Sequence, residues 1–374
     1  MDFTHVIADI TKGFAAFTWQ NGVMLLLGLV LIYLAIWKEY EPVLLLPIGF
    51  GCVLANLGMS NEVGFMKVFY DAGIKTEIFP LVIFIGVGAM IDFGPLLSQP
   101  SLIMLGAAGQ FGIYFALLLA ILLGFPLNEA AAIGSIGAID GPTAIFVGER
   151  LAPNIIAPIA VAAYSYMSLI PIIQPPIMRL MTSRKERLIR MEYSPKPVSR
   201  LTRVIFPILV TILVALVAPD AAPLMAALML GNLLREALVV DRLSVMAQNE
   251  LINIATLFLG LAIGSTMTAQ SFLNWNTLMI LGLGLLAFVV DTIAGLLFGK
   301  LMAVVTKGKV NPLIGACGIS AFPMAGRLSA QMALEEDPTN FILMHAMGSN
   351  TAGQLGSVIA GGLLLALVKG IGGF

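Results

Sequence analysis

The chain has 374 residues, of which 59% are hydrophobic and 11% are charged, and its mean hydropathy is +0.98. A soluble domain is only about 45–50% apolar, so this composition argues against a soluble protein and predicts an all-α polytopic membrane protein. The net charge of −1 gives no sign of a nucleic-acid partner. Roughly ten to twelve segments approach the roughly 20 apolar residues that a bilayer requires.

The N-terminal segment, residues 1–20, carries the mixed charges Asp2, Asp9 and Lys12 and has no small-residue cleavage site before the first apolar stretch. It is therefore predicted to be an interfacial helix, and not a cleaved signal peptide. Residues 21–180 follow as a first membrane repeat.

The segment Gly134–Thr143 places Asp140, Gly141 and Pro142 inside an otherwise apolar stretch. Proline removes a backbone donor and clashes with the preceding turn, so we expect a discontinuous helix whose freed carbonyl groups lie beside the carboxylate. An Asp at mid-membrane costs about 2.5–3.5 kcal/mol, which favours a functional role. The alternative is that Asp140 caps the second half-helix, and both roles are compatible.

Further polar residues interrupt apolar segments of the chain. Tyr166 lies about 12 residues into its predicted span, where it is either an interfacial anchor or a group that carries a proton or bonds an ion. Asp92 precedes Phe93-Gly94-Pro95 and is interpreted as a helix end. Asp291 is a reserve candidate for a proton or ion path.

Residues 181–203 form a basic linker. Eight of the twenty basic residues of the chain lie between Arg179 and Arg203. The positive-inside rule therefore places this linker in the cytoplasm. The same charges could also dock a soluble partner or acidic membrane lipid.

The second membrane repeat, residues 204–374, contains the segment Asn311–Pro323, with neutral oxygens at Asn311 and Ser320 and a second proline break. One carboxylate with amide, hydroxyl and carbonyl oxygens suits Na⁺ better than a transition metal, which would require His or Cys ligands. Arg327 follows the break. It either reaches to the interface or binds a carboxylate with its guanidinium.

An internal repeat relates the two halves. An offset of 181 residues aligns Ile133, Gly134, Gly137 and Pro142 with Ile314, Gly315, Gly318 and Pro323, and Ser168 with Ser349 beside Asn350. Asn350 is either an ion ligand or a helix–helix hydrogen-bonding group. The pattern predicts two inverted repeats with discontinuous helices in a transporter-like, elevator-type architecture, with the ion site where the broken helices meet.

Short catalytic motifs are missing from the sequence. It contains no Gly-x-Ser-x-Gly, nucleotide-binding loop or dinucleotide glycine motif, and its two cysteines, Cys52 and Cys317, give no metal spacing. ATP-driven pumping and ordinary hydrolase chemistry therefore find no support.

These motifs resemble the β subunits of the sodium-pumping, biotin-dependent decarboxylases, a family that includes the oxaloacetate, methylmalonyl-CoA, glutaconyl-CoA and malonate systems. The similarity rests on Lys38–Pro42, Leu44–Gly51, Gly137–Thr143, Ala163–Met167 and Asn311–Arg327, and extends over nearly the full chain.

The resemblance implies a membrane subunit that decarboxylates carboxybiotin, consumes a proton and exports Na⁺. The implied partners are carboxyltransferase and biotin-carrier subunits and a small membrane-anchoring subunit, in a complex with further copies of this chain in a bacterial or archaeal cytoplasmic (inner) membrane. This chain itself carries no biotin-attachment motif.

The positions that match the family's ion and proton path are Asp140, Tyr166, Asn311, Gly315, Ser320 and Arg327, with Asn350 in addition. Of these, Asp140, Tyr166 and Arg327 would take part in catalysis, Arg327 by holding carboxybiotin. Asp140, Asn311, Gly315, Ser320 and Asn350 would bind Na⁺.

Two rival functions remain at this stage. A stand-alone Na⁺/H⁺ antiporter or Na⁺-coupled organic-anion transporter would share the repeat pattern, although an antiporter has less need of Arg327. A non-transporting scaffold would not need Asp140 in an unwound helix. The sequence does not specify which acid the complex decarboxylates, the Na⁺ stoichiometry or the oligomeric state.

Overall fold

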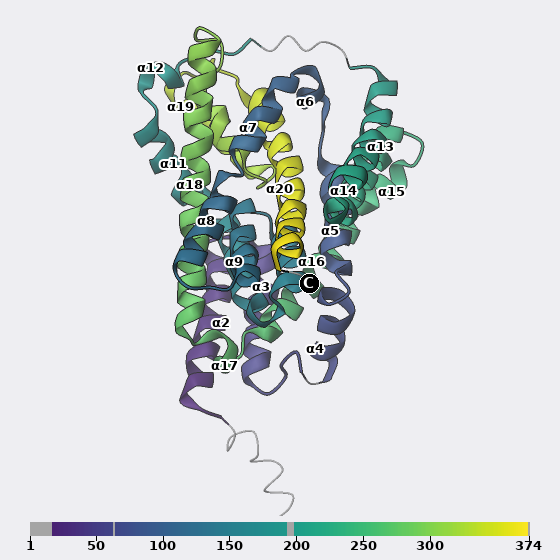
Figure 1. The fold of residues 1–374 in the computed structure, drawn as a ribbon, viewed down its shortest axis with the longest axis vertical. Helices are drawn as coiled ribbons and strands as arrows, with labels where there is room; N and C mark the ends of the chain where they lie inside the picture. The colour runs from purple at the N-terminus through teal and green to yellow at the C-terminus, as the bar shows by residue number, and fades with distance from the viewer. Residues whose placement is uncertain (1–16, 63, 193–197, 373–374) are drawn as a thin grey trace, which may run out of the picture. The chain divides into compact units, whose positions relative to one another are not determined.

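The computed structural model describes residues 17–62, 64–192 and 198–372, and every regular element within these ranges is helical (Figure 1). Six of the described helices are long and apolar enough to cross a membrane, or eight spans are present if each of two bent helix pairs counts as one. The all-helical membrane class is confirmed. Most of the predicted N-terminal interfacial helix, residues 1–16, lies outside the described residues.

The number of described helices that are long and apolar enough to cross a membrane is smaller than the ten to twelve apolar segments counted from the sequence. Helices α9 (Leu127–Gly134) and α10 (Gly141–Leu151), for example, are apolar but short. Most of their residues are buried. An apolar sequence marks burial against protein as well as burial against lipid, so an apolar segment alone does not identify a membrane span.

The chain divides into two compact units. The first comprises residues 1–79 and 253–279. Its elements are α2 (Trp19–Trp37), α3 (Pro42–Asn56), α4 (Gly64–Phe69), the π-helix η1 (Tyr70–Ile74), most of α16 (Ile252–Thr266) and α17 (Ala269–Phe272). Helices α2 and α3 approach closely at two glycines, where a Cβ on Gly28 would lie 2.8 Å from the carbonyl oxygen of Gly49.

The second unit comprises residues 80–252 and 280–374. Its elements are most of α5 (Ile78–Met90), α6 (Gly94–Ser98), η2 (Pro100–Leu102), α7 (Ile103–Ala108), α8 (Phe111–Leu122), α9, η3 (Ser135–Ala138), α10, η4 (Pro153–Ile155), α11 (Ile156–Met181), α12 (Arg184–Arg187), α13 (Arg200–Val217), η5 (Pro219–Ala221), α14 (Ala222–Ala237), α15 (Asp241–Met246), the π-helix η6 (Ala247–Leu251), most of α18 (Trp275–Val305), η7 (Pro312–Gly318), α19 (Met324–Glu336) and α20 (Leu343–Gly372).

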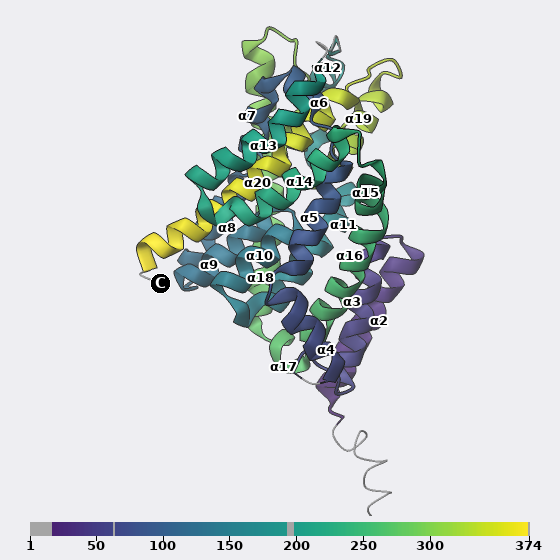
Figure 2. The same cartoon turned by 90° about the vertical axis from the view of Figure 1, so that its right-hand side faces the viewer.

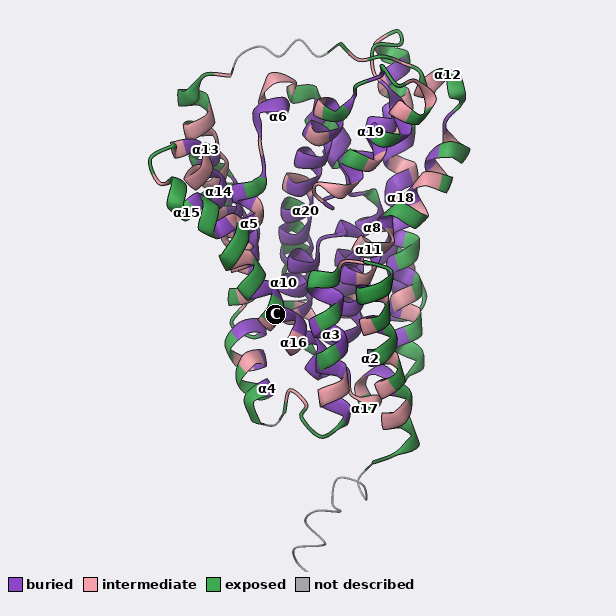
Figure 3. Cartoon of the chain, turned by 180° about the vertical axis from the view of Figure 1, so that it is seen from behind, coloured by how far each residue is buried: buried purple, intermediate pink, exposed green. Residues whose placement is uncertain are grey.

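Helix α20 is the central element of the second unit. It packs against α7, α10, α19 and η7, while α13 and α14 pair with each other (Figures 1 and 2). In the most apolar stretch of each helix, 67% of the residues of α20 are buried but only 11% of those of α13. In Figure 3, α20 is mostly in the colour of buried residues, whereas α13 is mostly in the colours of exposed and intermediate ones. The polar residues of α20 are therefore enclosed by protein, whereas α13 presents an apolar surface suited to lipid.

The two units do not coincide with the two predicted repeats. Each unit combines residues from both 21–180 and 204–374. A repeat is defined by internal similarity and a unit by packing, so the two divisions describe different properties of the chain.

Candidate functional site

The first broken helix lies between α9 and α10. The 3-10 helix η3 ends at Ala138, Ile139 adopts a left-handed conformation with φ of 53°, and Asp140 is extended before α10 begins at Gly141. A β-branched residue in this conformation costs about 1–3 kcal/mol, so the surrounding packing must hold it there. Pro142 in the first turn of α10 fits the start of the second half-helix.

The carboxylate of Asp140 is buried, with 6% of the residue exposed. Its Oδ2 accepts hydrogen bonds from Thr143 Oγ1 at 2.6 Å, from Gln354 Nε2 at 3.0 Å and from Ser357 Oγ at 3.3 Å. No basic side chain in the described part of the chain forms an ion pair with it. A buried carboxylate with no protein counterion is suited to bind a cation.

The second broken helix lies between η7 and α19. Residues 319–323 are not helical, and the carbonyl group of Ile319 is bonded from α20. Asn350 Nδ2 donates to the carbonyl oxygens of Ile319 at 2.7 Å and Cys317 at 3.3 Å, while Asn350 Oδ1 is buried without a hydrogen-bond partner. An unpartnered buried oxygen is available to a ligand.

One face of α20 joins the two breaks. Asn350 contacts the second break, whereas Gln354 and Ser357, four and seven residues later, contact Asp140. Residues at this spacing share one helix face. A direct link also exists, because Ser320 Oγ donates to the carbonyl oxygen of Ala138. The structure thus brings Asp140, Ser320 and Asn350 into one buried region.

Gly315 allows a close approach of backbones. A Cβ at Gly315 would lie 2.1 Å from the carbonyl oxygen of Gly295, and one at Gly299 would lie 2.6 Å from that of Pro312. Gly295 and Gly299 form a small-xxx-small pattern on α18, against which η7 packs. Because Gly315 has no side chain, it allows η7 to pack closely against α18.

Tyr166 lies near the first break but does not bond Asp140. Its hydroxyl donates to the carbonyl oxygen of Leu281, and a Cβ at Gly284 would lie 2.8 Å from its ring and 2.7 Å from Ile136 of η3. A different tyrosine packs on the break itself, since a Cβ at Gly141 would lie 2.1 Å from the ring of Tyr164.

Arg327 lies in the first turn of α19 and is exposed. Its backbone N–H donates to the carbonyl oxygen of Pro323 at 3.2 Å, and its guanidinium has no ion-pair partner within the described ranges. An exposed guanidinium with free donors can bind a carboxylate from outside the chain in a bidentate manner.

Asn311 lies away from this region, at the start of η7. Its Nδ2 donates to the carbonyl oxygens of Arg187 at 2.9 Å and Ile189 at 2.8 Å, and its Oδ1 accepts the N–H of Leu313 at 3.0 Å. Both polar atoms of the side chain are therefore engaged in holding the backbone.

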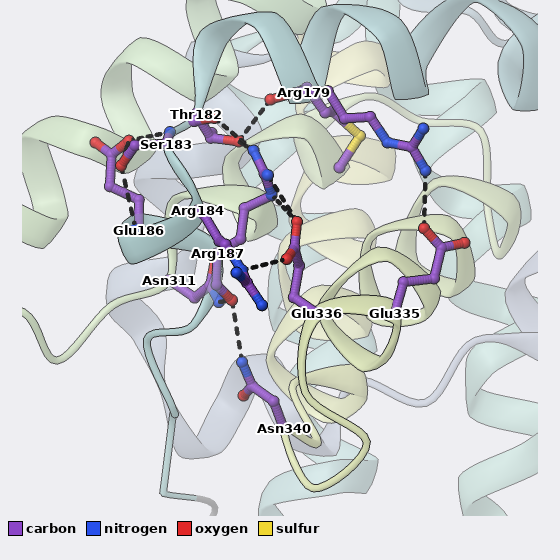
Figure 4. A network of polar contacts seen from close by, with 11 residues as sticks. Arg179, Thr182, Ser183, Arg184, Glu186, Arg187, Asn311, Glu335, Glu336 and Asn340 are labelled. Carbon is purple, nitrogen blue, oxygen red and sulfur yellow. Dashed lines mark hydrogen bonds and ion pairs between the residues drawn. The ribbon is translucent and has the colours of Figure 1, made fainter.

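Several arginines in and beside the basic linker pair with acids of the same unit. Arg187, Arg184 and Arg190 pair with Glu336 and Asp337 at the end of α19, as Figure 4 shows for Glu336. Arg179 pairs with Glu335 at 2.9 Å, and Arg203 lies 3.7 Å from Glu236 and 3.9 Å from Asp92. Five arginines of this region, Arg179, Arg184, Arg187, Arg190 and Arg203, therefore have an acidic partner in the same unit.

Two other acids have structural partners. Asp92 Oδ1 accepts the N–H of Gly94 at 2.8 Å at the start of α6, in agreement with its interpretation as a helix end. Asp291 is fully buried in α18; its Oδ1 accepts the N–H of Gly112 near the start of α8, whereas its Oδ2 is buried without a hydrogen-bond partner in the described part of the chain. This position is where a carboxylate stabilises a helix N-terminus.

Gln354, Ser357 and Gln110 were missed by the sequence reasoning. Gln110 Nε2 donates to the carbonyl oxygens of Gly318 at 3.1 Å and Gly353 at 3.3 Å. Gln354 and Ser357 follow Asn350 at helical spacing, which could have identified them, whereas Gln110 gives no such signal.

The fold and the site define a class: a polytopic helical membrane protein with a buried carboxylate where two broken helices meet. The particular family follows from comparison. Residues 20–368 match the family described as "Na+-transporting oxaloacetate decarboxylase beta subunit". The chain belongs to this family and is a β subunit of the Na⁺-transporting biotin-dependent decarboxylases.

Three relatives illustrate the similarity. The glutaconyl-CoA decarboxylase subunit β of Acidaminococcus fermentans is 52% identical over 370 residues, covering 98% of both chains. The methylmalonyl-CoA decarboxylase subunit β of Veillonella parvula is 53% identical over 359 residues, covering 96% of both. The oxaloacetate decarboxylase β chain of Klebsiella pneumoniae is 46% identical over 412 residues, covering 93% of this chain and 95% of the relative. Relatives named for three different acids thus have similar sequence identity to this chain.

Proposed function

We propose that Asp140 binds the transported Na⁺ where the two broken helices meet. The observation that carries this proposal is a buried carboxylate with three hydrogen-bond donors and no basic partner in the described chain. Burying such a charge is costly unless a cation compensates it, and the basic residues within the described ranges do not supply one here.

The remaining Na⁺ ligands are proposed from the second break. Ser320 and Asn350 supply hydroxyl and amide oxygens, and the non-helical backbone from Ile319 supplies carbonyl groups. Hard oxygen ligands of this kind suit Na⁺. Gly315 supports the site by letting η7 approach α18. Asn311 is left out of the ligand set because both its polar atoms already bind backbone groups.

Arg327 is proposed to hold the carboxylate of carboxybiotin, which a partner subunit delivers. Its exposed, unpaired guanidinium supports this role. Decarboxylation breaks the N–CO₂ bond, releases CO₂ and leaves the bonding electrons on the biotin nitrogen, which takes up a proton. Tyr166, buried beside η3, is proposed to act in the delivery of that proton.

Export of Na⁺ must be coupled to this reaction, because moving one charge costs about 2.3 kcal/mol per 100 mV. We propose that two inverted repeats provide alternating access to the site by an elevator-type motion of one bundle against the other. The partners are a carboxyltransferase, a biotin carrier, a small anchoring subunit and further copies of the chain, in a bacterial or archaeal cytoplasmic membrane. The acid is chosen elsewhere in the complex, in agreement with relatives named for three acids.

The test is transport by the assembled complex in liposomes. Carboxybiotin formed by the partner subunits should drive ²²Na⁺ movement, and Arg327→Lys should reduce decarboxylation about tenfold or more, because lysine keeps the charge but loses the planar fork. Na⁺ movement that does not depend on carboxybiotin would instead favour an antiporter.

A further inference from the structure

The segment 182–190, here called the strap, runs across both ends of the second broken hairpin, which comprises η7, the break and α19. Asn311 precedes η7, and Asn340 lies between α19 and α20. Both side chains meet the strap from the hairpin side, as Figure 4 shows. The strap therefore contacts the start and the end of the hairpin at once.

Two amide groups bind the same two carbonyl groups of the strap. Asn311 Nδ2 lies 2.9 Å from the carbonyl oxygen of Arg187 and 2.8 Å from that of Ile189. Asn340 Nδ2 lies 3.1 and 3.2 Å from the same two oxygens. Asn311 is 0% and Asn340 is 1% exposed, so release of the strap would leave two buried donors without partners.

An ion pair also joins the strap to α19. Arg187 Nη2 lies 2.6 Å from Glu336 Oε1, with the two side chains only 14% and 21% exposed, and Arg187 Nη1 donates to the carbonyl oxygen of Thr182 at 2.6 Å. Partly buried pairs of this kind resist screening more than surface pairs do. Arg187 thus holds α19 with its side chain while its carbonyl group holds both asparagines.

The strap is connected to the Na⁺ site through η7. Asn311 Oδ1 accepts the N–H of Leu313 and so sets the start of η7. The end of η7 is fixed by close glycine contacts and leads to Ser320, which bonds Ala138 of the first break. Because η7 has no free space to absorb a shift, movement of its start must move Ser320.

We propose that Asn311 and Asn340 form an amide clamp on the strap that positions the second broken hairpin for Na⁺-coupled turnover. Asn311 is then a positioning residue and not an ion ligand, and Asn340 is its equal partner. The clamp uses the segment that connects the two sequence repeats to hold the hairpin of the second one.

The test compares Asn311→Asp and Asn340→Asp, alone and together, in the complete complex. Aspartate keeps the size and the Oδ1 acceptor but replaces the donor with an atom that repels the strap carbonyl groups. Arg179→Gln is the matched control, because the Arg179–Glu335 pair is 62% and 46% exposed and does not touch the strap carbonyl groups.

Two readouts separate positioning from ligation. Trypsin cleavage of the solubilised complex after Arg187 and Arg190 should accelerate about tenfold in each single variant, as expected when buried hydrogen bonds are lost. The two single variants should change the same parameter of Na⁺-dependent turnover, either the maximal rate or the half-saturating Na⁺ concentration, by the same factor. The double variant should match the single variants, since the two residues act as one unit. The control should leave cleavage and turnover unchanged.

The opposite pattern would overturn the clamp. If Asn311 were a ligand, an added charge at this position would maintain or strengthen Na⁺ binding, and Asn340→Asp would change neither the half-saturating Na⁺ concentration nor cleavage. Should an aspartate variant fail to assemble, Asn311→Ser and Asn340→Ser remove the donors without adding charge, and unequal effects would reject the proposal. The cleavage readout requires no activity, so failure of the Asp140 assignment would not affect it.

Discussion

The two broken helices are held by different kinds of contact. In the first, one charged side chain, Asp140, receives donors from its own helix and from α20. In the second, no charge is present between Ile319 and Pro323, and amide side chains bond the carbonyl groups of Cys317, Gly318 and Ile319. In the proposed Na⁺ site, the first break would thus provide the charge, whereas the second would provide neutral oxygens and the geometry. Each can be disturbed separately.

The largest effect is expected from Asp140→Asn, which removes the charge and keeps the shape. Na⁺-dependent decarboxylation by the assembled complex should fall about a hundredfold or more, since an amide cannot neutralise a buried cation. Asp140→Glu, which keeps the charge but shifts it, should retain more activity. Full Na⁺-dependent turnover in the Asp140→Asn variant would show that the negative charge at the first break is not required.

Packing at the second break should come next. A Cβ at Gly295 would lie 2.3 Å from the carbonyl oxygen of Gly315, whereas one at Gly282, on the same helix, meets nothing within 4 Å. Gly295→Ala should therefore lower the stability of the complex by about 1–3 kcal/mol. Gly282→Ala should be neutral or stabilising by up to about 1 kcal/mol. Equal midpoints of thermal unfolding in detergent for the two variants would contradict the packing argument.

Intermediate effects are expected on α20, where Gln354 serves the first break and Asn350 the second. Gln354→Leu should raise the Na⁺ concentration for half-maximal turnover about tenfold, because one of three donors to the carboxylate is lost. Asn350→Leu should also lower the maximal rate, because it frees two carbonyl groups of the broken backbone. Identical kinetics in both variants would mean that the two breaks act as a single unit.

The smallest effect concerns the strap and pH. The hydroxyl and N–H of Thr339, followed by Arg190, lower the pKa of Asp337 from its usual 3.8 to about 2. Because the pKa is lowered on folding, the stabilisation is fully present above about pH 4 and is lost as the pH falls toward 2. The hydrogen-exchange rate of residues 183–190, corrected for intrinsic rates, should rise as the pH falls through this window. The rise should be smaller in Asp337→Asn. If hydrogen exchange in Asp337→Asn showed the same pH dependence as in the unmodified chain, protonation of Asp337 would be excluded as the cause.

Much of this arrangement could be predicted from residue type and order. Asp140 was singled out because packing alone does not require a carboxylate beside Gly-Pro in an apolar segment. The pairing of Gly134 and Gly137 with Gly315 and Gly318 predicted a second break, and both breaks are present. The basic charge of the linker predicted a topology, but its acidic partners at the end of α19 are 147 to 156 residues away along the chain and were not foreseen.

Asn311 shows what residue type leaves undecided. Its position near the second break suggested an ion ligand, because an amide oxygen is a suitable ligand by type. The structure directs that oxygen to the N–H of Leu313 and the amide nitrogen to the strap. Residue type gives the chemistry that a side chain can perform, whereas the chain segments packed around it determine which partner it meets.

The sequence by itself determined that this is a helical membrane protein with a costly carboxylate and two proline breaks, because composition and local backbone chemistry act over a few residues. Tertiary structure alone decided that Gln354 and Ser357 bond Asp140, that Ser320 joins the breaks and that Asn340 meets the strap. These contacts connect residues from 153 to 217 positions apart, and no local preference specifies them.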